Sequence, residues 1–230
     1  MSPTIRWGLV AVAAIAAAVL PSAVVLIRGA AADTASPAPV TADFGDAEAS
    51  AQARRLAGWV ARSSDNARAP FIVIDKLRAH IYVFDAGARL RASSPVLLGA
   101  APGDDTAPGI GERPLAAVMP EERTTPAGRF VAEPGRNLRG EDVLWVSYAD
   151  AVSIHPVLLS NPDERRLERL ATPTAEDNRV SYGCVNVPTA FFEANVHPLL
   201  AARTLVYILP ETKDLDTVFG MRPPQRMAAG

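Results

Sequence analysis

Cys184 is the only cysteine among the 230 residues, and it lies in the stretch SYGCVNV, residues 181–187. A lone thiol is usually either a small buried side chain or a nucleophile. Gly183 precedes it directly, and glycine permits a tight backbone turn that aims successive N–H groups at one point. Such a turn suits acyl transfer, with an oxyanion hole built from the backbone N–H groups of Tyr182, Gly183 and Cys184.

A thiol nucleophile needs a base, because an ordinary thiol with a pKa of about 8.5 is mostly protonated at neutral pH. The chain has three histidines. His155 ends the strand-like run VSIH, and Pro156 halts further pairing, so its ring is expected at the rim of a sheet. His80 lies in the strand-like run HIYVF, and His197 ends a predicted helix, so both have structural explanations. From these residues alone, two roles for His155 stay open: the base for the thiol, or a side chain that only fills space in the fold.

Cys184, His155 and His197 are also side chains of metal-binding type. However, no Cys-x-x-Cys or His-x-x-x-His spacing supports a site, and structural zinc takes four ligands. We therefore expect neither a metal nor another cofactor.

Strand patterns surround these residues. Twenty prolines, well above the usual ~5%, favour strands joined by rigid loops over a helical bundle. Residues 100–123 are rich in proline and glycine and predict a long loop. Apolar and β-branched runs predict strands at 71–75, 80–84, near 95–98, and at 129–132, 144–148, 152–155 and 204–209.

Helical spacing of apolar residues predicts short helices at 47–62, 161–171 and 189–196. Asn161 is the expected N-cap of the second, with Leu167 and Leu170 on its apolar face. The sequence thus predicts a mainly β domain with short decorating helices.

Residues 7–27 form an uncharged apolar run of 21 residues between Arg6 and Arg28. A helix of that length spans roughly 30 Å, the thickness of a bilayer core. Signal-peptide cores are shorter, about 7–15 residues, although Ala30–Ala32 offers a small-residue cleavage site. An uncleaved membrane anchor, a removed signal peptide and a buried core helix all stay open. The first two place the rest of the chain in the periplasm or on the outer face of the cytoplasmic membrane.

The formal net charge of the chain is −2, and the sequence has no basic stripe with interleaved aromatic residues. Both observations argue against a nucleic-acid partner.

The expected organisation has four parts. They are a signal peptide or anchor at 1–32, a linker with a short amphipathic helix at 33–69, a catalytic domain at 70–210 and a C-terminal tail at 211–230.

Four segments resemble, in order, the L,D-transpeptidase catalytic family (the YkuD type). VSIHP followed by SYGCVNV resembles its signature: a histidine, then Ser/Thr-His-Gly-Cys, an apolar residue and Asn or Arg. The long segment PFIVIDKLRAHIYVFDAGARLRASSPVLLG resembles the opening hairpin region and its glycine. TTPAGRF resembles the Thr-Pro-x-Gly-x-Phe element, and LVYIL the final strand. The resemblance covers about residues 70–210.

The resemblance implies an L,D-transpeptidase-like β-sandwich or barrel. In it, Cys184 would attack a peptidoglycan stem peptide and form a thioester, while His155, oriented by a nearby backbone carbonyl, acts as base. It also implies a carbapenem adduct at Cys184. Asn186 occupies the family's Asn/Arg position. Ser181, Asn186 and Arg179 are the candidate substrate-binding residues.

The sequence departs from the family pattern in two ways. Tyr182 stands where the family usually has histidine, and the change matters only if that side chain contacts substrate. In addition, 28 residues separate His155 from Cys184, a longer gap than usual. The helix predicted at 161–171 accounts for the excess as an insertion that forms part of a lid or wall over the site.

We therefore expect an L,D-transpeptidase that builds or modifies the cell wall, with the acceptor unspecified. An L,D-peptidase that resolves the thioester with water is an alternative. A non-catalytic wall-binding module, in which Tyr182 marks a lapsed site, is another.

Overall fold

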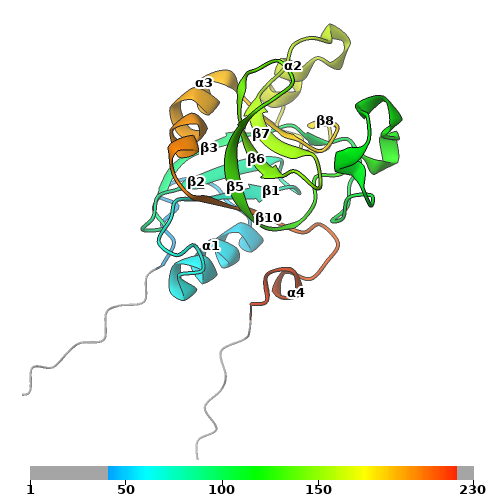
Figure 1. The fold of residues 1–230 in the computed structure, drawn as a ribbon. Coiled ribbons are helices and arrows are strands. Elements are labelled where there is room, and N and C mark those ends of the chain that lie inside the picture. The colour runs from blue at the N-terminus through cyan, green and yellow to red at the C-terminus, as the bar shows by residue number, and fades with distance from the viewer. Residues whose placement is uncertain (1–40, 222–230) are drawn as a thin grey trace, which may run out of the picture. The chain divides into compact units, whose positions relative to one another are not determined.

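A computed structural model describes residues 41–221 of the chain, which form a mainly β structure with short helices (Figure 1). This confirms the predicted fold class. The strands are β1 (Phe71–Asp75), β2 (His80–Phe84), β3 (Leu90–Pro95), β4 (Leu98–Gly99), β5 (Gly128–Arg136), β6 (Asp142–Ser147), β7 (Val152–Pro156), β8 (Arg179–Ser181), β9 (Val185–Val187) and β10 (Thr204–Ile208). The α-helices are α1 (Ala51–Ser63), α2 (Arg166–Ala171), α3 (Thr189–Phe191) and α4 (Leu215–Phe219).

Shorter helical segments complete the description. A π-helix, Phe192–Val196, and a 3₁₀ helix, His197–Ala201, continue α3. The predicted loop at 100–123 contains three 3₁₀ turns: Ile110–Glu112, Leu115–Ala117 and Pro120–Glu122. Within residues 41–221, no helix is long and apolar enough to cross a membrane. The anchor or signal predicted at 7–27 lies outside the described residues.

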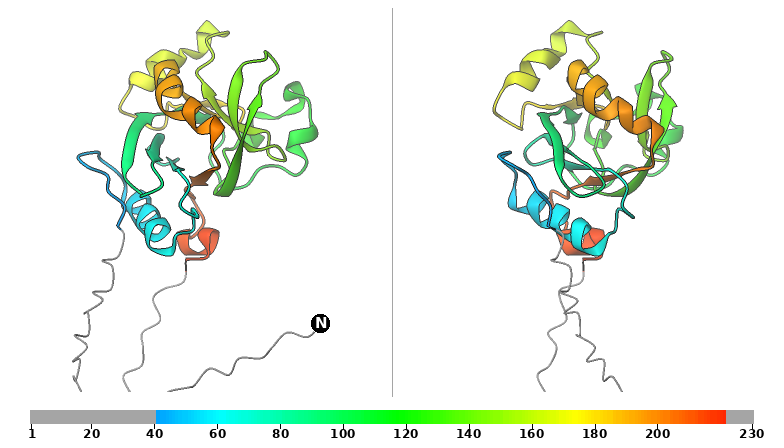
Figure 2. Two further views of the ribbon diagram at one scale, coloured as in Figure 1. Left: turned by 60° about the vertical axis from the view of Figure 1, so that its left-hand side comes forward. Right: turned by 90° about the vertical axis from the view of Figure 1, so that its left-hand side faces the viewer.

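Eight strands form one mixed sheet in the order β3-β2-β1-β10-β5-β6-β7-β9, and β4 pairs with β8 separately. β1 and β10 are parallel, as are β7 and β9. Just past β3, Leu97 exchanges two backbone hydrogen bonds of 2.9 Å with Asn186 of β9. This bridge links the two ends of the strand order, so the sheet curls back on itself (Figure 2). The strand predicted near 95–98 is wrong, because the chain leaves β2 at this point to reach β9.

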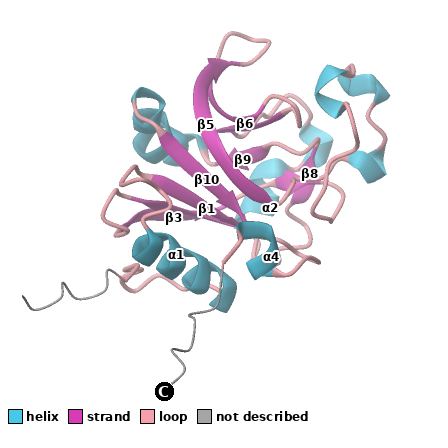
Figure 3. Cartoon of the chain, turned by 60° about the horizontal axis from the view of Figure 1, so that its bottom comes forward, coloured by secondary structure: helices cyan, strands magenta, loops and turns pink. Residues whose placement is uncertain are grey.

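Two apolar cores fill the two faces of the sheet. Alternate residues of β1 belong to different cores. Ile72 and Ile74 point into the core inside the curl of the sheet, and Phe71 and Val73 point into the core on its other face. The second core lies between the sheet and helices α1 and α4 (Figure 3). Phe44 is a buried member of it, and so is Phe219. The compact unit therefore includes residues that the sequence analysis placed in the linker (33–69) and in the tail (211–230).

The two longer predicted helices form, but one is shorter than expected. Ser50 caps α1 by accepting the N–H of Ala53. Asn161 caps a 3₁₀ turn, Pro162–Glu164, rather than a continuous helix. Arg165 then adopts a left-handed conformation with φ 50°, so α2 begins only after it. As a result Leu170 is buried but Leu167 is 55% exposed, and the predicted apolar face of two leucines is wrong.

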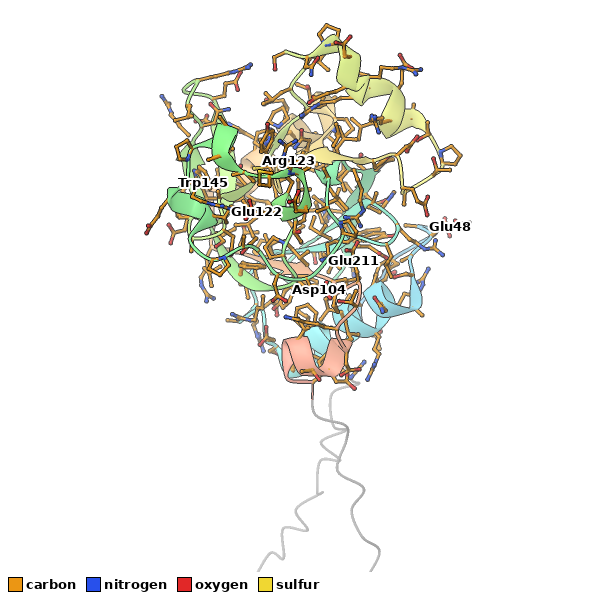
Figure 4. The ribbon with its side chains drawn as sticks, turned by 90° about the vertical axis from the view of Figure 1, so that its right-hand side faces the viewer. Glu48, Asp104, Glu122, Arg123, Trp145 and Glu211 are labelled. Carbon is orange, nitrogen blue, oxygen red and sulfur yellow. The ribbon has the colours of Figure 1, made fainter. Side chains whose placement is uncertain are left out.

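A buried ion pair ties the long loop to the rest of the fold. The Lys76 ammonium is fully buried and lies 2.8 Å from the Asp104 carboxylate. It also donates to the carbonyl of Thr125 at 3.0 Å. Asp104 in turn accepts the backbone N–H groups of Glu211 and Thr212 at 2.7 and 2.8 Å. Figure 4 shows Asp104 and Glu211 lying together below Arg123. The cluster thus joins β1, the loop and the segment after β10.

Replacing Asp104 by Asn is expected to lower the free energy of unfolding by roughly 3–5 kcal/mol, because buried Lys76 loses its hydrogen-bonded counter-charge and keeps, among the described residues, only Glu211 at 3.9 Å. Urea unfolding followed by fluorescence measures this loss. Asp105→Asn is the matched control: its carboxylate is 73% exposed and, within residues 41–221, pairs only with Lys213, so a change of at most about 1 kcal/mol is expected. Equal losses in the two variants would contradict the role given to Asp104.

The same pair predicts a pH dependence. Burial raises the pKa of Asp104, but the Lys76 ammonium and the N–H donors of Lys213 and Thr212 outweigh it and lower the pKa to about 2. Because the folded-state pKa lies below the unfolded value of about 4, the stabilisation is complete above that value. It is lost as the pH falls towards 2. The difference in stability between wild type and Asp104→Asn is therefore expected to shrink across this window.

Candidate active site

Parallel pairing of β7 with β9 builds the site. Ile154 is paired with Val185, and both are buried in the core inside the curl. His155 is paired with Asn186 one position further on. Because side chains alternate along a strand, His155 and Asn186 lie on the opposite face from that core. Cys184 directly precedes β9, so the pairing brings residues 29 positions apart together at the end of the sheet.

His155 and Cys184 lie close enough for each side chain to shift the pKa of the other. The Nδ1 atom of His155 lies 2.7 Å from the carbonyl oxygen of Pro156. A carbonyl only accepts, so Nδ1 carries a proton and Nε2 presents its lone pair, with Nδ2 of Asn186 at 3.3 Å from it. The structure therefore joins the two residues predicted as nucleophile and base, and it places the carbonyl of Pro156 where it orients the ring.

The pair shifts both pKa values toward proton transfer. Burial raises the pKa of Cys184, but the hydrogen bond and charge of His155, helped by Ser153, outweigh it and lower the pKa below the usual thiol value. Burial lowers the pKa of His155, but the hydrogen bond and charge of Cys184 outweigh it and raise the pKa. Both shifts make transfer of the proton from the sulfur to the ring easier, and Cys184 is partly exposed rather than fully buried.

Ser153 is a site residue that the sequence analysis missed. Its Oγ lies 3.6 Å from the Cys184 sulfur, and the thiol also contacts the carbonyl of Ala151 at 3.5 Å. The signal was present in the strand VSIHP, because Ser153 lies two residues before His155 and so on the same face.

The turn before Cys184 needs glycine. Gly183 has φ +127°, and a Cβ there would lie 2.9 Å from the carbonyl oxygen of Thr124. Thr125, the neighbour of Thr124, holds this turn in place. Its hydroxyl donates to the carbonyl of Gly183 at 2.8 Å and accepts the N–H of Gly99 at 2.9 Å. The TTPAGRF segment therefore supports the nucleophile from behind.

Ser181 closes the turn from the other side. Its hydroxyl donates to the carbonyl of Cys184 at 2.6 Å and accepts the N–H of Gly183 at 3.1 Å. The Gly183 N–H is thus already engaged, which differs from its predicted place in an oxyanion hole. No hydrogen bond is found for the N–H groups of Tyr182 and Cys184 within the described residues. An oxyanion hole built from these groups stays a prediction.

The three candidate substrate-binding residues are all engaged within the protein. Ser181 is 3% exposed and holds the turn. Asn186 is fully buried, and its Nδ2 lies 3.3 Å from both Nε2 of His155 and the carbonyl of Cys184. Arg179 pairs with Glu211 at the edge of the buried ion cluster. Contact between these side chains and a substrate stays a prediction. Ser181 has a structural role within its own turn, whereas the roles of Asn186 and Arg179 depend on partners far away in the sequence.

Tyr182 is the more open side chain beside the nucleophile. It is 37% exposed, and the guanidinium of Arg123 lies 3.9 Å above its ring. Arg123 comes from the end of the long loop (Figure 4), and it forms no salt bridge with any residue in 41–221. A cation stacked on an aromatic ring therefore flanks Cys184, in place of the histidine usual in the resembled family.

The other two histidines lie apart from this pair. His80 packs on the ring of Tyr82, and His197 lies 3.6 Å from the Asp142 carboxylate. In the part of the chain that the structure describes, no three His, Cys, Asp or Glu side chains gather as metal ligands.

Several solved structures are similar to this chain. The catalytic domain of the Enterococcus faecium L,D-transpeptidase is 15% identical, and the match covers 62% of this chain and 98% of that one with a TM-score of 0.36. The helical cell shape determining protein Pgp2 of Campylobacter jejuni is 14% identical over 65% of this chain and 51% of its own, with a TM-score of 0.43. For an L,D-transpeptidase of Xylanimonas cellulosilytica the values are 15%, 61%, 60% and 0.37.

These similarities agree with the resemblance that the motifs predicted. No family model and no curated protein matches the sequence. The chain spans nearly the whole Enterococcus domain but only about half of the Campylobacter protein. At 14–15% identity and TM-scores below 0.5 they assign no activity, which has to come from the site itself.

Cys184 is expected to react with iodoacetamide well below the pH at which a free thiol does, because its pKa is lowered by His155. Alkylation rates measured by mass spectrometry between pH 4 and 10 report the thiolate. His155→Ala is expected to move the rise in rate to higher pH. His80→Ala is the matched control and is expected to leave the profile unchanged. Identical profiles for wild type and His155→Ala would contradict the coupled pair.

Proposed function

We propose that the chain is a cysteine-dependent acyltransferase that acts on peptidoglycan stem peptides, an L,D-transpeptidase. The observation that carries the proposal is the placement of Cys184 beside His155 by the pairing of β7 with β9, with a lowered thiol pKa and a sharp glycine turn. A nucleophile, an oriented base and backbone donors at one point are the parts that acyl transfer requires.

In the first half of the reaction, Nε2 of His155 takes the thiol proton and the sulfur attacks a carbonyl carbon of the donor peptide. The negative charge on the carbonyl oxygen is met by the N–H groups of Tyr182 and Cys184. The peptide C–N bond then breaks, and His155 returns its proton to the leaving amine. A thioester on Cys184 remains.

In the second half, an amine of a neighbouring stem attacks the thioester and gives up a proton to His155. The C–S bond breaks as the new amide forms, and the proton returns to the sulfur. By resemblance, the donor is a tetrapeptide cut between its diamino acid and the terminal D-alanine. Water in place of the amine would make the same site a peptidase.

The stacked side chains of Arg123 and Tyr182 suit such a donor. Stem peptides carry free carboxylates, and the Arg123 guanidinium pairs with no carboxylate among the described residues. We assign it to a carboxylate of the donor peptide, held next to the reacting carbonyl. The Tyr182 ring would support the guanidinium from below.

The compartment is part of the proposal. Peptidoglycan lies outside the cytoplasmic membrane, and the apolar run at 7–27 is long enough for an anchor or signal. We therefore place the domain in the periplasm or on the outer face of that membrane.

A carbapenem is expected to add its full mass to the wild-type chain, because opening of the β-lactam ring by Cys184 loses no atoms. Intact mass spectrometry measures the adduct, and Cys184→Ser is expected to give none under the same conditions. Arg123→Gln, which keeps the nucleophile and its base, is expected to slow adduct formation without abolishing it. An unmodified wild-type chain that is folded and carries a reactive thiol would overturn the assignment to this class.

Product analysis separates the three functions. Purified enzyme is incubated with isolated cell wall, and the muropeptides are then separated and weighed. New cross-linked dimers that are absent with Cys184→Ser are the expected result. Shortened monomers alone would identify the peptidase. An unchanged wall together with retention of the chain on it would identify a binding module.

A further inference from the structure

Arg166 links the crossover between β7 and β9 to the candidate base. It opens helix α2, and its side chain is only 10% exposed. Its guanidinium Nη1 donates to Oδ1 of Asn186, and its Nε binds Glu164 at 2.6 Å. Asn186 in turn contacts His155 on the paired strand. Arg166 is therefore two hydrogen bonds away from the imidazole.

This contact decides which way the Asn186 amide faces. The two ends of an asparagine side chain have the same shape but opposite character, since the oxygen accepts and the NH₂ donates. Arginine has donors only, so the end of Asn186 that meets Arg166 is Oδ1. The NH₂ end then faces Nε2 of His155 and the carbonyl of Cys184, each at 3.3 Å.

The orientation of the amide has a chemical consequence. A donor that faces Nε2 favours the neutral tautomer with a lone pair there and the proton on Nδ1. Nδ1 in turn donates to the carbonyl of Pro156 at 2.7 Å. Only this tautomer can accept the thiol proton at Nε2. If the amide turned over, its oxygen would face Nε2 and stabilise a proton there, and the ring could not act as base.

We propose that Arg166 is a positioning residue that acts through Asn186 to hold His155 in the tautomer that takes up the thiol proton. The catalytic value of this tautomer rests on the proposed function, whereas the tautomer itself does not. The segment between β7 and β9 would then support the base through Asn186, whereas its predicted role as a lid or wall stays a prediction.

The crossover is anchored well enough for this role. Leu170 of α2 packs against Leu97 and Val157 in a small apolar cluster of its own. Arg169 fixes the two ends of the insertion by donating to the carbonyls of Glu164 and Asp177. Arg166 is thus presented by a helix that is held on both sides.

The charged and titratable groups that act on His155 are Cys184 and Arg166. The thiolate favours the imidazolium, and the guanidinium disfavours it. Loss of Arg166 is therefore expected both to release the amide and to raise the pKa of His155.

The test reads the tautomer directly, in a Cys184→Ala background so that the thiolate does not contribute. Long-range ¹H–¹⁵N spectra of the three imidazoles distinguish a proton on Nδ1 from one on Nε2, and His155→Gln assigns the signal. In Cys184→Ala alone we expect the Nδ1–H form above the pKa of His155. Adding Arg166→Met is expected to move a measurable share of the population to Nε2–H, although the carbonyl of Pro156 still favours Nδ1–H, and to raise the pKa.

Arg165→Met is the matched control. It removes the same charge one position earlier, but its guanidinium is 69% exposed and pairs with Glu168. The tautomer and pKa of His155 are expected to stay as in the background. Arg166→Lys keeps the charge without the same reach and is expected to change the tautomer with a smaller rise in pKa. If Arg166→Met does not fold, Glu164→Gln removes the charged partner of Arg166 and is expected to shift the tautomer in the same direction, with a lower rather than a higher His155 pKa because the guanidinium charge is less compensated.

In the chain with its cysteine, Arg166→Met is expected to slow carbapenem acylation in proportion to the lost tautomer, about twofold if half of it is lost, with Arg165→Met unchanged. A wild-type chain that is not acylated would sink the proposed function but leave the spectra as a test of Arg166. An Nδ1–H tautomer and a His155 pKa that are the same with Arg166→Met as with Arg165→Met would overturn the role of Arg166.

Discussion

The parallel pairing of β7 with β9 is the constraint on which the site depends. Its register sends Ile154 and Val185 into the core and His155 and Asn186 to the other face. A slip of one residue would bury the imidazole and expose the valine, so the apolar residues enforce the position of the polar ones. Parallel neighbours also require a crossover of a dozen or more residues. The long gap between base and nucleophile therefore follows from the topology as well as from an insertion, and the crossover carries Arg166.

The nucleophile itself is held by side chains rather than by the sheet. Cys184 lies just before β9, in a turn whose shape is fixed by hydroxyl groups: Thr125 binds the carbonyl of Gly183, and Ser181 binds that of Cys184. Behind them, Lys76 is buried against Asp104 and the carbonyl of Thr125. The buried charges thus fix the segment that supports the turn. A rigid frame of this kind suits a reaction in which the sulfur has to meet a carbonyl carbon at one defined point.

Much of this could be predicted from local patterns. The runs FIVID, HIYVF and TLVYI are strands because their apolar and β-branched residues leave few alternatives, and all three were predicted within a residue. The roles of Arg179, Asn186 and Arg166 could not be predicted, because each is set by a partner 20 or more positions away. Leu167 was misplaced for a local reason: the left-handed Arg165 rotates the register of α2, and no pattern of apolar residues reports that break.

The place of β10 bears on how the chain reaches this structure. β10 follows the other nine described strands in sequence, yet it lies in the middle of the large sheet, between β1 and β5. Without it, the half that begins with β1 and the half from β5 to β9 are joined only by the Leu97–Asn186 bridge and the short β4–β8 pairing among the described strands. During synthesis, each half of the sheet would keep an unpaired edge strand until β10 emerges from the ribosome. Such long-range pairing slows folding and leaves strand edges open to aggregation. A chaperone that shields these edges would therefore act before β10 has paired with β1 and β5.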